Sequence, residues 1–242
     1  MSDNNLTKIP THIAFILDGN RRWARSQGLA DNEGHKKGFK KIEELCDWCL
    51  KYKVKYLTLY CLSIENLNRS KIELDYLFKY LKDALGDNTI KKMNEKQIKL
   101  QILGDFDVLP ADLANDIKKV NEKQKIIKDN NITLHLQLCI GYGARREIAD
   151  AVKSIVNKVK NNELKLEEIN EDIIAENLYT TGMPDPDLLV RTGGEQRLSN
   201  FLLWQCSYTE LYFCEKMLPE FEEKDFLLAL YFFENRNRRY GR

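Results

Sequence analysis

Short apolar runs alternate with amphipathic stretches along the chain. Six apolar or β-branched runs predict buried strands, at residues 13–17, 56–62, 99–104, 132–138, 187–194 and 210–214. Apolar residues at helical spacing predict helices over residues 34–52, 71–86, 111–129, 145–160 and 223–235. Strands separated by helices of this length are typical of an α/β fold, with a mostly parallel central sheet flanked by helices.

Length and composition predict one globular body. The 242 residues are 43% hydrophobic, enough for a single domain over residues 1–242, and we expect residues 1–11 to be a flexible N-terminus. No basic segment followed by an apolar run opens the chain, so we expect an intracellular, cytoplasmic protein. With 38 basic and 37 acidic residues, the composition does not favour a nucleic-acid partner.

The six cysteines favour reduced thiols in the core. Cys46 and Cys49 form a CxxC pair, but no second pair with zinc-ligand spacing accompanies them. Both lie on the helical stripe that includes Ile42 and Leu45, so we interpret them as core residues.

Polar groups follow four of the predicted strands, and each group contains arginine. They are Asp18 to Arg22, then Ser63 to Asn66 with Arg69, then Gly141 to Arg145, and finally Arg191 to Ser199. One arginine near a strand end is more typical of a surface ion pair. Because the carboxyl ends of parallel strands share one edge, the four together predict a cavity that binds anionic oxygens.

Asp18 needs its own explanation, because a carboxylate repels the phosphate that arginines attract. A magnesium ion resolves the conflict, since Mg²⁺ binds one or two carboxylates together with phosphate oxygens and water. Glu210, at the start of a predicted strand, is a candidate for the second carboxylate. The alternative is that Asp18 caps a helix or pairs with Arg22.

Several common nucleotide-site and catalytic patterns are missing from the sequence. It contains no G-x-x-x-x-G-K-[ST] phosphate loop, no G-x-G-x-x-G after the first strand and no G-x-S-x-G elbow. A DDxxD cluster is also missing. The sequence therefore lacks the motifs that usually indicate nucleotide hydrolysis or dinucleotide binding.

Five segments together resemble one known family. "DGNRRWA", "GHKKG", "SIENLNRS", "RTGGEQRLSNFLLWQCSYTELYF" and "NRNRRYGR" are similar in order and spacing to motifs of the cis-prenyltransferases, the undecaprenyl and dehydrodolichyl diphosphate synthases. The resemblance runs from His12 to Arg242. It implies the fold of that family, in which a hydrophobic tunnel adjoins the sheet.

The resemblance also implies an activity. Members add isopentenyl diphosphate to farnesyl diphosphate or a similar allylic primer, with Mg²⁺, and each addition creates a cis double bond. The product would be a polyprenyl precursor of a glycan carrier lipid, of the dolichol or the cell-wall type. A homodimer is implied, with peripheral association at the endoplasmic reticulum or inner membrane surface.

Roles for individual residues follow from the same resemblance. Asp18 would bind Mg²⁺ and assist departure of the diphosphate, and Glu210 would complete the metal site, within the chain or across a dimer. The primer diphosphate would be held by Gly19, Asn20, Arg21 and Arg22, with Trp23 and His35 nearby. The second motif supplies Ser63, Glu65, Asn66 and Arg69, of which Asn66 would help to remove a proton. Isopentenyl diphosphate would be held by Arg191, Arg197 and Ser199, and by Arg239 and Gly241 of the tail, from a neighbouring subunit.

Two positions depart from the family pattern. Asp31 stands where many members carry arginine, so we expect a weaker primer contact or a substitute in Arg25 or Lys36. Leu67 stands where an aromatic residue is frequent. Asp31 is the only support for an alternative function, a non-catalytic partner subunit, and the intact Asp18, Asn66 and Glu210 argue against it.

Two further interpretations concern the tunnel and the competing class of binding protein. Leu62, Leu136, Leu138 and the apolar stripe of the 71–86 helix could line the tunnel, although each is more typical of ordinary core.

A generic phosphate- or nucleic-acid-binding domain would bind RNA or DNA in a salt-sensitive way. The near-neutral charge of the chain disfavours that class.

Overall fold

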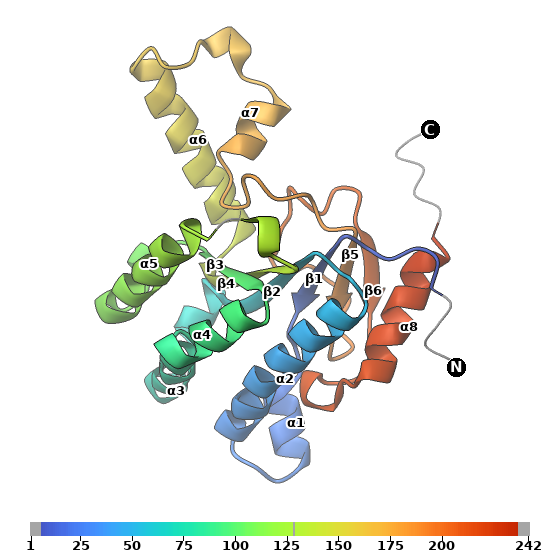
Figure 1. The fold of residues 1–242 in the computed structure, drawn as a ribbon. Coiled ribbons are helices and arrows are strands. Elements are labelled where there is room, and N and C mark those ends of the chain that lie inside the picture. The colour runs from blue at the N-terminus through green and yellow to red at the C-terminus, as the bar shows by residue number, and fades with distance from the viewer. Residues whose placement is uncertain (1–5, 128, 237–242) are drawn as a thin grey trace.

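A computed structural model describes residues 6–127 and 129–236 of the chain. Its centre is a six-stranded sheet in which every pairing of neighbours is parallel (Figure 1). The strands are β1 (His12–Ile16), β2 (Tyr56–Ser63), β3 (Ile98–Leu103), β4 (Leu134–Tyr142), β5 (Leu188–Arg191) and β6 (Glu210–Phe213). Their order across the sheet is β3-β4-β2-β1-β5-β6. The prediction of an α/β fold with a parallel sheet is confirmed.

Helices connect the strands. They are α1 (Asn20–Ser26), α2 (Asp31–Lys51), α3 (Lys71–Ala84), α4 (Asp87–Glu95), α5 (Ala111–Lys125), α6 (Ala144–Lys160), α7 (Glu171–Glu176) and α8 (Glu223–Glu234). The long predicted helices are confirmed, whereas α4 and α7 were not predicted. Figure 1 shows α6 and α7 projecting away from the sheet as an arm.

The larger part of the core lies between one face of the sheet and helices α2, α3, α5 and α8. Phe15 of β1 is fully buried there and stacks on Phe226 of α8, with ring centroids 6.2 Å apart. Each such ring contributes roughly 2–3 kcal/mol through burial. Cys46 and Cys49 of α2 are free thiols buried in this cluster, as predicted.

The other face is covered by a smaller cluster that extends to the carboxyl ends of the strands. Tyr60 of β2 stacks on Phe201, with ring centroids 4.4 Å apart, and its hydroxyl donates to the Ser199 carbonyl at 3.3 Å. This stack anchors the 198–206 segment over the sheet. Ser199 is thereby brought next to the ends of β1 and β2.

Residues 6–11 lead into β1, and Leu6 and Ile9 pack against the larger core cluster. The flexibility expected for residues 1–11 stays a prediction. The backbone N–H of Thr7 donates to Glu234 at 2.6 Å, and that of Thr11 donates to Asp187 at 2.7 Å.

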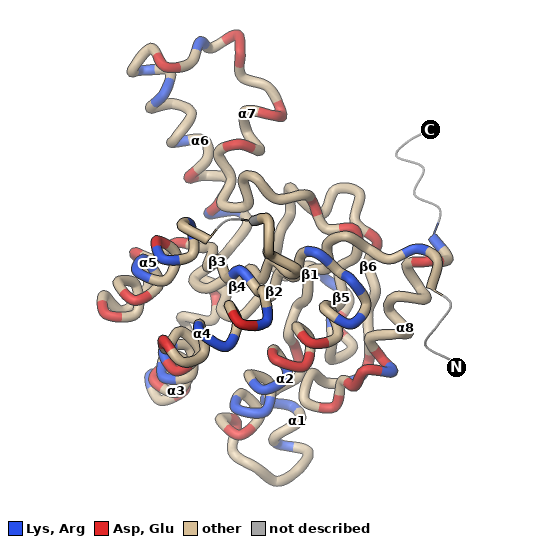
Figure 2. The backbone as a smooth tube through the Cα atoms, in the orientation of Figure 1, with Lys and Arg blue, Asp and Glu red and all other residues tan. Residues whose placement is uncertain are grey.

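The surface carries charges of both signs. Lys and Arg alternate with Asp and Glu along the outer helices (Figure 2). Within the described residues, every helix is too short or too polar to cross a bilayer.

Candidate active site

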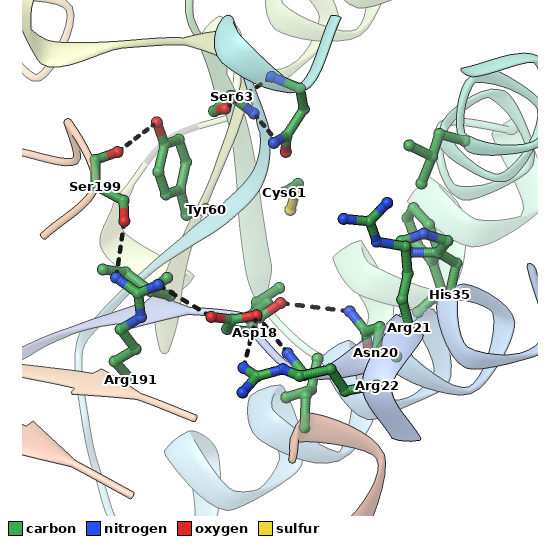
Figure 3. Close-up of a pocket in the computed structure, with 18 of the residues that line it drawn as sticks. Asp18, Asn20, Arg21, Arg22, His35, Tyr60, Cys61, Ser63, Arg191 and Ser199 are labelled. Carbon is green, nitrogen blue, oxygen red and sulfur yellow. Dashed lines mark hydrogen bonds and ion pairs between the residues drawn. The ribbon is translucent and has the colours of Figure 1, made fainter. Parts of the chain in front are cut away.

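A pocket of about 350 Å³ opens beyond the carboxyl ends of β1, β2 and β5, between α1, α2 and α3. Figure 3 shows polar side chains from β2, β5, α1, α2 and the turn after β1 pointing into it. Eleven of the predicted site residues line it: Asp18, Gly19, Asn20, Arg21, Arg22, His35, Ser63, Asn66, Arg69, Arg191 and Ser199. The structure therefore brings three of the four predicted strand-end groups, together with His35 of the "GHKKG" segment, to one cavity at the expected edge. The fourth group, residues 141–145, does not line it.

Asp18 is placed by a tight turn between β1 and α1. The next residue, Gly19, has a φ of 101°, a conformation that residues with a Cβ rarely adopt, and a Cβ there would lie 2.8 Å from the Met217 Cβ. The Asp18 backbone N–H donates to the Thr192 hydroxyl at 3.0 Å, and that hydroxyl donates to the Asp18 carbonyl at 2.7 Å. Glycine and threonine together fix the direction of the carboxylate.

The "GHKKG" segment allows α1 to lie directly on α2. A Cβ on Gly34 would come within 2.0 Å of the Asn20 carbonyl oxygen, and a Cβ on Gly38 within 2.4 Å of Asn20 Oδ1. Two glycines four residues apart therefore clear one face of α2 for Asn20. Between them, His35 is carried into the pocket.

The Asp18 carboxylate is surrounded by donors. Arg191 donates to Oδ2 at 3.0 Å, the Gly19 N–H donates to Oδ1 at 2.6 Å, and Arg22 lies 3.3 Å from Oδ1. Burial opposes ionisation, but the donors outweigh it and hold the pKa of Asp18 below its usual 3.8. Its side chain remains 31% exposed, so an ionised oxygen ligand faces the cavity.

Arg191 links Asp18 to the loop after β5. Its side chain is only 4% exposed. Nη1 donates to the Ser199 hydroxyl at 2.8 Å and also to the Arg197 carbonyl. Figure 3 shows its guanidinium lying between Asp18 and Ser199. A ligand bound by this loop would therefore lie beside a ligand bound at Asp18.

Ser63 and Asn66 form a closed turn at the end of β2. The Asn66 N–H donates to the Ser63 hydroxyl at 3.1 Å, and the Ser63 N–H donates to Asn66 Oδ1 at 3.4 Å. Both side chains line the pocket. Because Asn66 Oδ1 already accepts from the backbone, its Nδ2 is the group left to meet a ligand.

Glu73, in the first turn of α3, gathers three of the predicted residues. It accepts from Arg69 at 3.0 Å and from His35 Nε2 at 3.2 Å, and it lies 3.4 Å from Arg21. Its side chain is 14% exposed. Burial lowers the pKa of His35, more than the hydrogen bond to Glu73 raises it, so the ring is neutral at pH 7.

Each arginine that lines the pocket has a carboxylate partner. Arg22 and Arg191 pair with Asp18, Arg21 and Arg69 pair with Glu73, and Arg25 pairs with Asp31. An entering anion would therefore exchange with these carboxylates. The fixed positions of the arginines come from the same carboxylates.

The inner wall of the pocket is apolar. Phe39 and Ile42 of α2, Cys61 of β2 and Leu77 of α3 line it. Of the residues considered as tunnel lining, Leu77 reaches this pocket, whereas Leu62, Leu136 and Leu138 lie in the larger core cluster. The site thus combines a polar rim that suits phosphate with a lining that suits hydrocarbon.

Three predicted substrate contacts do not line the pocket. Trp23 lies beneath Lys37, whose Nζ is 4.3 Å from the ring centroid, because its side of α1 faces α2. Glu65 accepts from Asn200 Nδ2 at 2.7 Å. Arg197 pairs with Glu195, and its side chain is 60% exposed.

Glu210 lies at the amino ends of the strands, whereas Asp18 follows the carboxyl end of β1. Glu210 begins β6 and pairs with Leu188, which pairs with Ile13 near the start of β1. Five residues of extended chain separate Ile13 from Asp18, roughly 15 Å. Its carboxylate accepts from Arg236 Nε at 3.0 Å. The prediction that Glu210 joins Asp18 within one chain is wrong. Parallel strands all begin at one end of the sheet and the pocket lies at the other end, so the first residue of β6 is far from the pocket.

The C-terminal residues Arg239 and Gly241 lie outside the described residues. Their predicted contact with isopentenyl diphosphate stays a prediction.

The donor set at the pocket suits a loosely held Mg²⁺. No group of three or more His, Cys, Asp or Glu side chains in the described part of the chain could hold a metal ion. Asp18 offers a single ionised carboxylate in a half-open position. Mg²⁺ usually takes one or two carboxylates and completes its shell with water and phosphate oxygens, so the residues fit such an ion.

Glu73 and Arg25 were not among the site residues that the sequence predicted, although Arg25 was considered as a substitute for the arginine missing at position 31. Glu73 stands three residues after Ser70, the N-cap of α3, and its backbone N–H donates to the Ser70 hydroxyl at 3.4 Å. That spacing is the signature of a capping box. In the sequence alone, Glu73 therefore has the pattern of a helix-capping residue and carries no signal of the pocket.

Three comparisons with known proteins agree. Residues 16–241 match the family model "Putative undecaprenyl diphosphate synthase". A tritrans,polycis-undecaprenyl-diphosphate synthase (geranylgeranyl-diphosphate specific) of Thermoplasma volcanium is 44% identical over 237 residues, which are 96% of this chain and 89% of that protein. An isoprenyl transferase of Oceanobacillus iheyensis is 43% identical over 96% of this chain and 90% of its own length.

A solved structure is similar throughout. The crystal structure of lavandulyl diphosphate synthase from Lavandula x intermedia, in complex with dimethylallyl diphosphate, superposes with a TM-score of 0.90 at 37% identity. The match covers 97% of this chain and 99% of that one.

Proposed function

The chain belongs to the undecaprenyl diphosphate synthase family of cis-prenyltransferases, and from this we propose that it extends an allylic diphosphate with isopentenyl diphosphate in a Mg²⁺-dependent reaction. The protein is a transferase of prenyl groups. The observation that carries the substrate proposal is the pocket itself, where an ionised aspartate among arginines meets an apolar wall.

The two diphosphates would occupy neighbouring parts of the pocket. The primer diphosphate would lie between Asp18 and the group around Arg21, Arg22 and Arg69, with its hydrocarbon along the Leu77 wall. Isopentenyl diphosphate would lie at Ser199 and Arg191. Because Arg191 contacts both Asp18 and Ser199, it would hold the two reacting carbons close together.

The reaction forms one carbon–carbon bond for each unit added. The bond between the allylic carbon and the diphosphate oxygen breaks, and the diphosphate leaves with the electron pair. Asp18 would hold Mg²⁺, which when bound stabilises the charge of the leaving group, and Arg22 and Arg191 would add fixed positive charge. The alkene of isopentenyl diphosphate attacks the allylic carbon and then loses a proton.

Asn66 would orient the proton-loss step. An amide side chain does not keep a proton at neutral pH, so a base such as a diphosphate oxygen must take it. Asn66 is fixed by its two contacts with Ser63. Its Nδ2 is placed to donate to the substrate that loses the proton, which makes it a positioning group.

The product is a long apolar chain with a diphosphate head. Each new unit joins at the diphosphate end, so the far hydrocarbon tail would move along the wall formed by Phe39, Ile42 and Leu77 into a tunnel between α2 and α3. A polyprenyl diphosphate of this kind would serve as the precursor of a glycan carrier lipid. We place the protein in the cytoplasm, in peripheral contact with the membrane that takes up the product.

The deciding experiment is incubation of the full chain with labelled isopentenyl diphosphate, Mg²⁺ and one primer at a time. Farnesyl, geranylgeranyl and dimethylallyl diphosphates are the three primers to compare. We expect long, solvent-extractable products from farnesyl or geranylgeranyl diphosphate, and none in the presence of a chelator. Absence of incorporation with every primer would overturn the proposal.

A homodimer would give Glu210 a role that it lacks within one chain. If Glu210 of one copy serves the pocket of the other, Asp18→Ala and Glu210→Ala variants should each be inactive alone. Co-expression of the two should restore activity, because one pocket in each mixed dimer keeps both carboxylates. Failure to restore activity would reject the shared site.

The alternative of a non-catalytic partner subunit loses its support in the structure. That alternative rested on Asp31 alone. The Asp31 carboxylate pairs with Arg25, and Asp18 still lines the pocket, so the presence of Asp31 does not disrupt the site. Activity of the isolated chain in the assay above would exclude it.

A further inference from the structure

Arg25 and Asp31 form a two-point ion pair at the rim of the pocket. Arg25 Nε donates to Asp31 Oδ1 at 2.8 Å, and Nη2 donates to Oδ2 at 2.7 Å. Arg25 is in the last turn of α1 and Asp31 is the first residue of α2. The pair therefore joins the two helices that carry the first half of the site.

The geometry of this pair leaves part of the guanidinium for another anion. Asp31 occupies the side that Nε and Nη2 form, so Nη1 and the second hydrogen of Nη2 point elsewhere. Arg25 lines the pocket. A guanidinium can bind one carboxylate with its side edge and a phosphate oxygen with its far edge.

The charged residues around the Arg25–Asp31 pair belong to the part of the pocket where the primer diphosphate is proposed to bind, near Arg21 and Glu73. The bonds from Arg25 hold the pKa of Asp31 below its usual value, and the charge of Arg21 acts in the same direction. Asp31 raises the pKa of Arg25, and the charge of Glu73 raises it further. Arg25 thus lies within electrostatic reach of Glu73, which pairs with Arg21 and Arg69 on that side of the pocket.

We propose that Arg25 is a ligand of the primer diphosphate and that Asp31 is the positioning residue that aims it. This inference rests on the proposed function. A free arginine side chain loses rotamer freedom when a ligand immobilises it. Arg25 is 64% exposed, so without Asp31 that loss would fall on primer binding. With Asp31 in place, the guanidinium is already ordered.

Lys36 does not share this arrangement. Its Nζ lies 3.8 Å from Glu33, and it is absent from the residues that line the pocket. Of the two cations that the sequence offered to replace an arginine at position 31, the geometry favours Arg25. Glu33 and Lys36 then provide a matched control pair in the same turn of α2.

The test measures KM for the primer, KM for isopentenyl diphosphate and kcat. Arg25→Ala should raise the primer KM roughly tenfold, as expected for one charge-assisted contact. Asp31→Asn should raise it roughly threefold, and kcat and the KM for isopentenyl diphosphate should change less than twofold. In the double variant the Asp31→Asn effect should vanish, because Asp31 acts only through Arg25. Glu33→Gln should change none of these values.

Three results would overturn the inference. These are a primer KM that falls or stays unchanged in Asp31→Asn, an effect that multiplies in the double variant, and an equal change in the KM for isopentenyl diphosphate. Calorimetric binding of inorganic pyrophosphate to each variant keeps the test separate from the proposed activity. If the wild type makes no product, weaker pyrophosphate binding by both variants still supports the inference, and unchanged binding rejects it.

Discussion

Asp18 and Glu73 each hold two arginines in the same pocket, but their surroundings differ. Asp18 stands in a strand-to-helix turn forced by a left-handed glycine, and its side chain is 31% exposed. Glu73 stands in a regular helix, is 14% exposed, and also accepts from His35. One carboxylate keeps open space for a further ligand, whereas the other is enclosed by its partners.

The difference separates two tasks that the same side-chain chemistry performs. An open carboxylate beside cations can take part in a reaction, because a metal ion or a leaving group can reach it. An enclosed carboxylate can only fix the positions of the groups around it. We therefore expect loss of Asp18 to act on turnover and loss of Glu73 to act on binding and stability.

The largest effect should come from Asp18→Ala. We expect kcat to fall by roughly 10³-fold, the scale of losing a charge-stabilising group from an active site. Pyrophosphate binding should persist, because Arg22 and Arg191 lose a competing carboxylate. Incorporation of labelled isopentenyl diphosphate measures the first effect and calorimetry the second. Turnover within tenfold of wild type would show that Asp18 does not take part in the reaction.

Glu73→Gln should have the next largest effect. Arg21 and Arg69 would repel each other without their shared carboxylate, so we expect the primer KM to rise roughly tenfold and the free energy of unfolding to fall by about 2 kcal/mol. The kcat should stay within about threefold of wild type. Steady-state kinetics and urea unfolding measure these values. Asp75→Asn, at an exposed position of the same helix, is the control. A loss of kcat as large as that of Asp18→Ala would remove the distinction between the two carboxylates.

The smallest effect should come from acid. Burial holds the pKa of His35 below 6.5, so the unfolded chain takes up this proton first as pH falls, and the native state loses stability below about pH 6.5. Asp18 stays ionised in that range, because its pKa is below 3.8. The free energy of unfolding should therefore decline more between pH 6.5 and 5 in wild type than in His35→Asn. His12, with a pKa lowered by burial to about 4, contributes equally to both. Identical slopes would contradict the assignment.

Sequence predicted the parallel sheet and most of the pocket, because strands and strand-end loops have local signals. Asp18, Arg21 and Arg191 were found by asking which residues follow apolar runs. The same rule disfavours Glu210, which begins its strand. The role proposed for Glu210 as a metal ligand depends on a second copy of the chain, which one sequence does not describe.

Two further differences between sequence and structure concern residues within helices. Trp23 was grouped with its neighbours along the chain, but one turn of helix directs it to α2 instead of the cavity. Glu73 has the spacing of a capping residue and gives no sign in sequence that Arg21, 52 residues earlier, will meet it. Contacts of this kind depend on how α1 and α3 pack on α2, which local patterns do not specify.

The pairing of every pocket arginine with a carboxylate affects which anions the protein binds. The five arginines share three carboxylates, Asp18, Glu73 and Asp31, so most of the positive charge of the resting cavity is already compensated. Free phosphate or a nucleotide is therefore attracted less strongly than it would be by unpaired arginines. A molecule gains entry by exchanging several of these internal ions at once and by filling the adjacent hydrocarbon surface. Selectivity for an amphiphilic diphosphate then begins before any bond is made or broken.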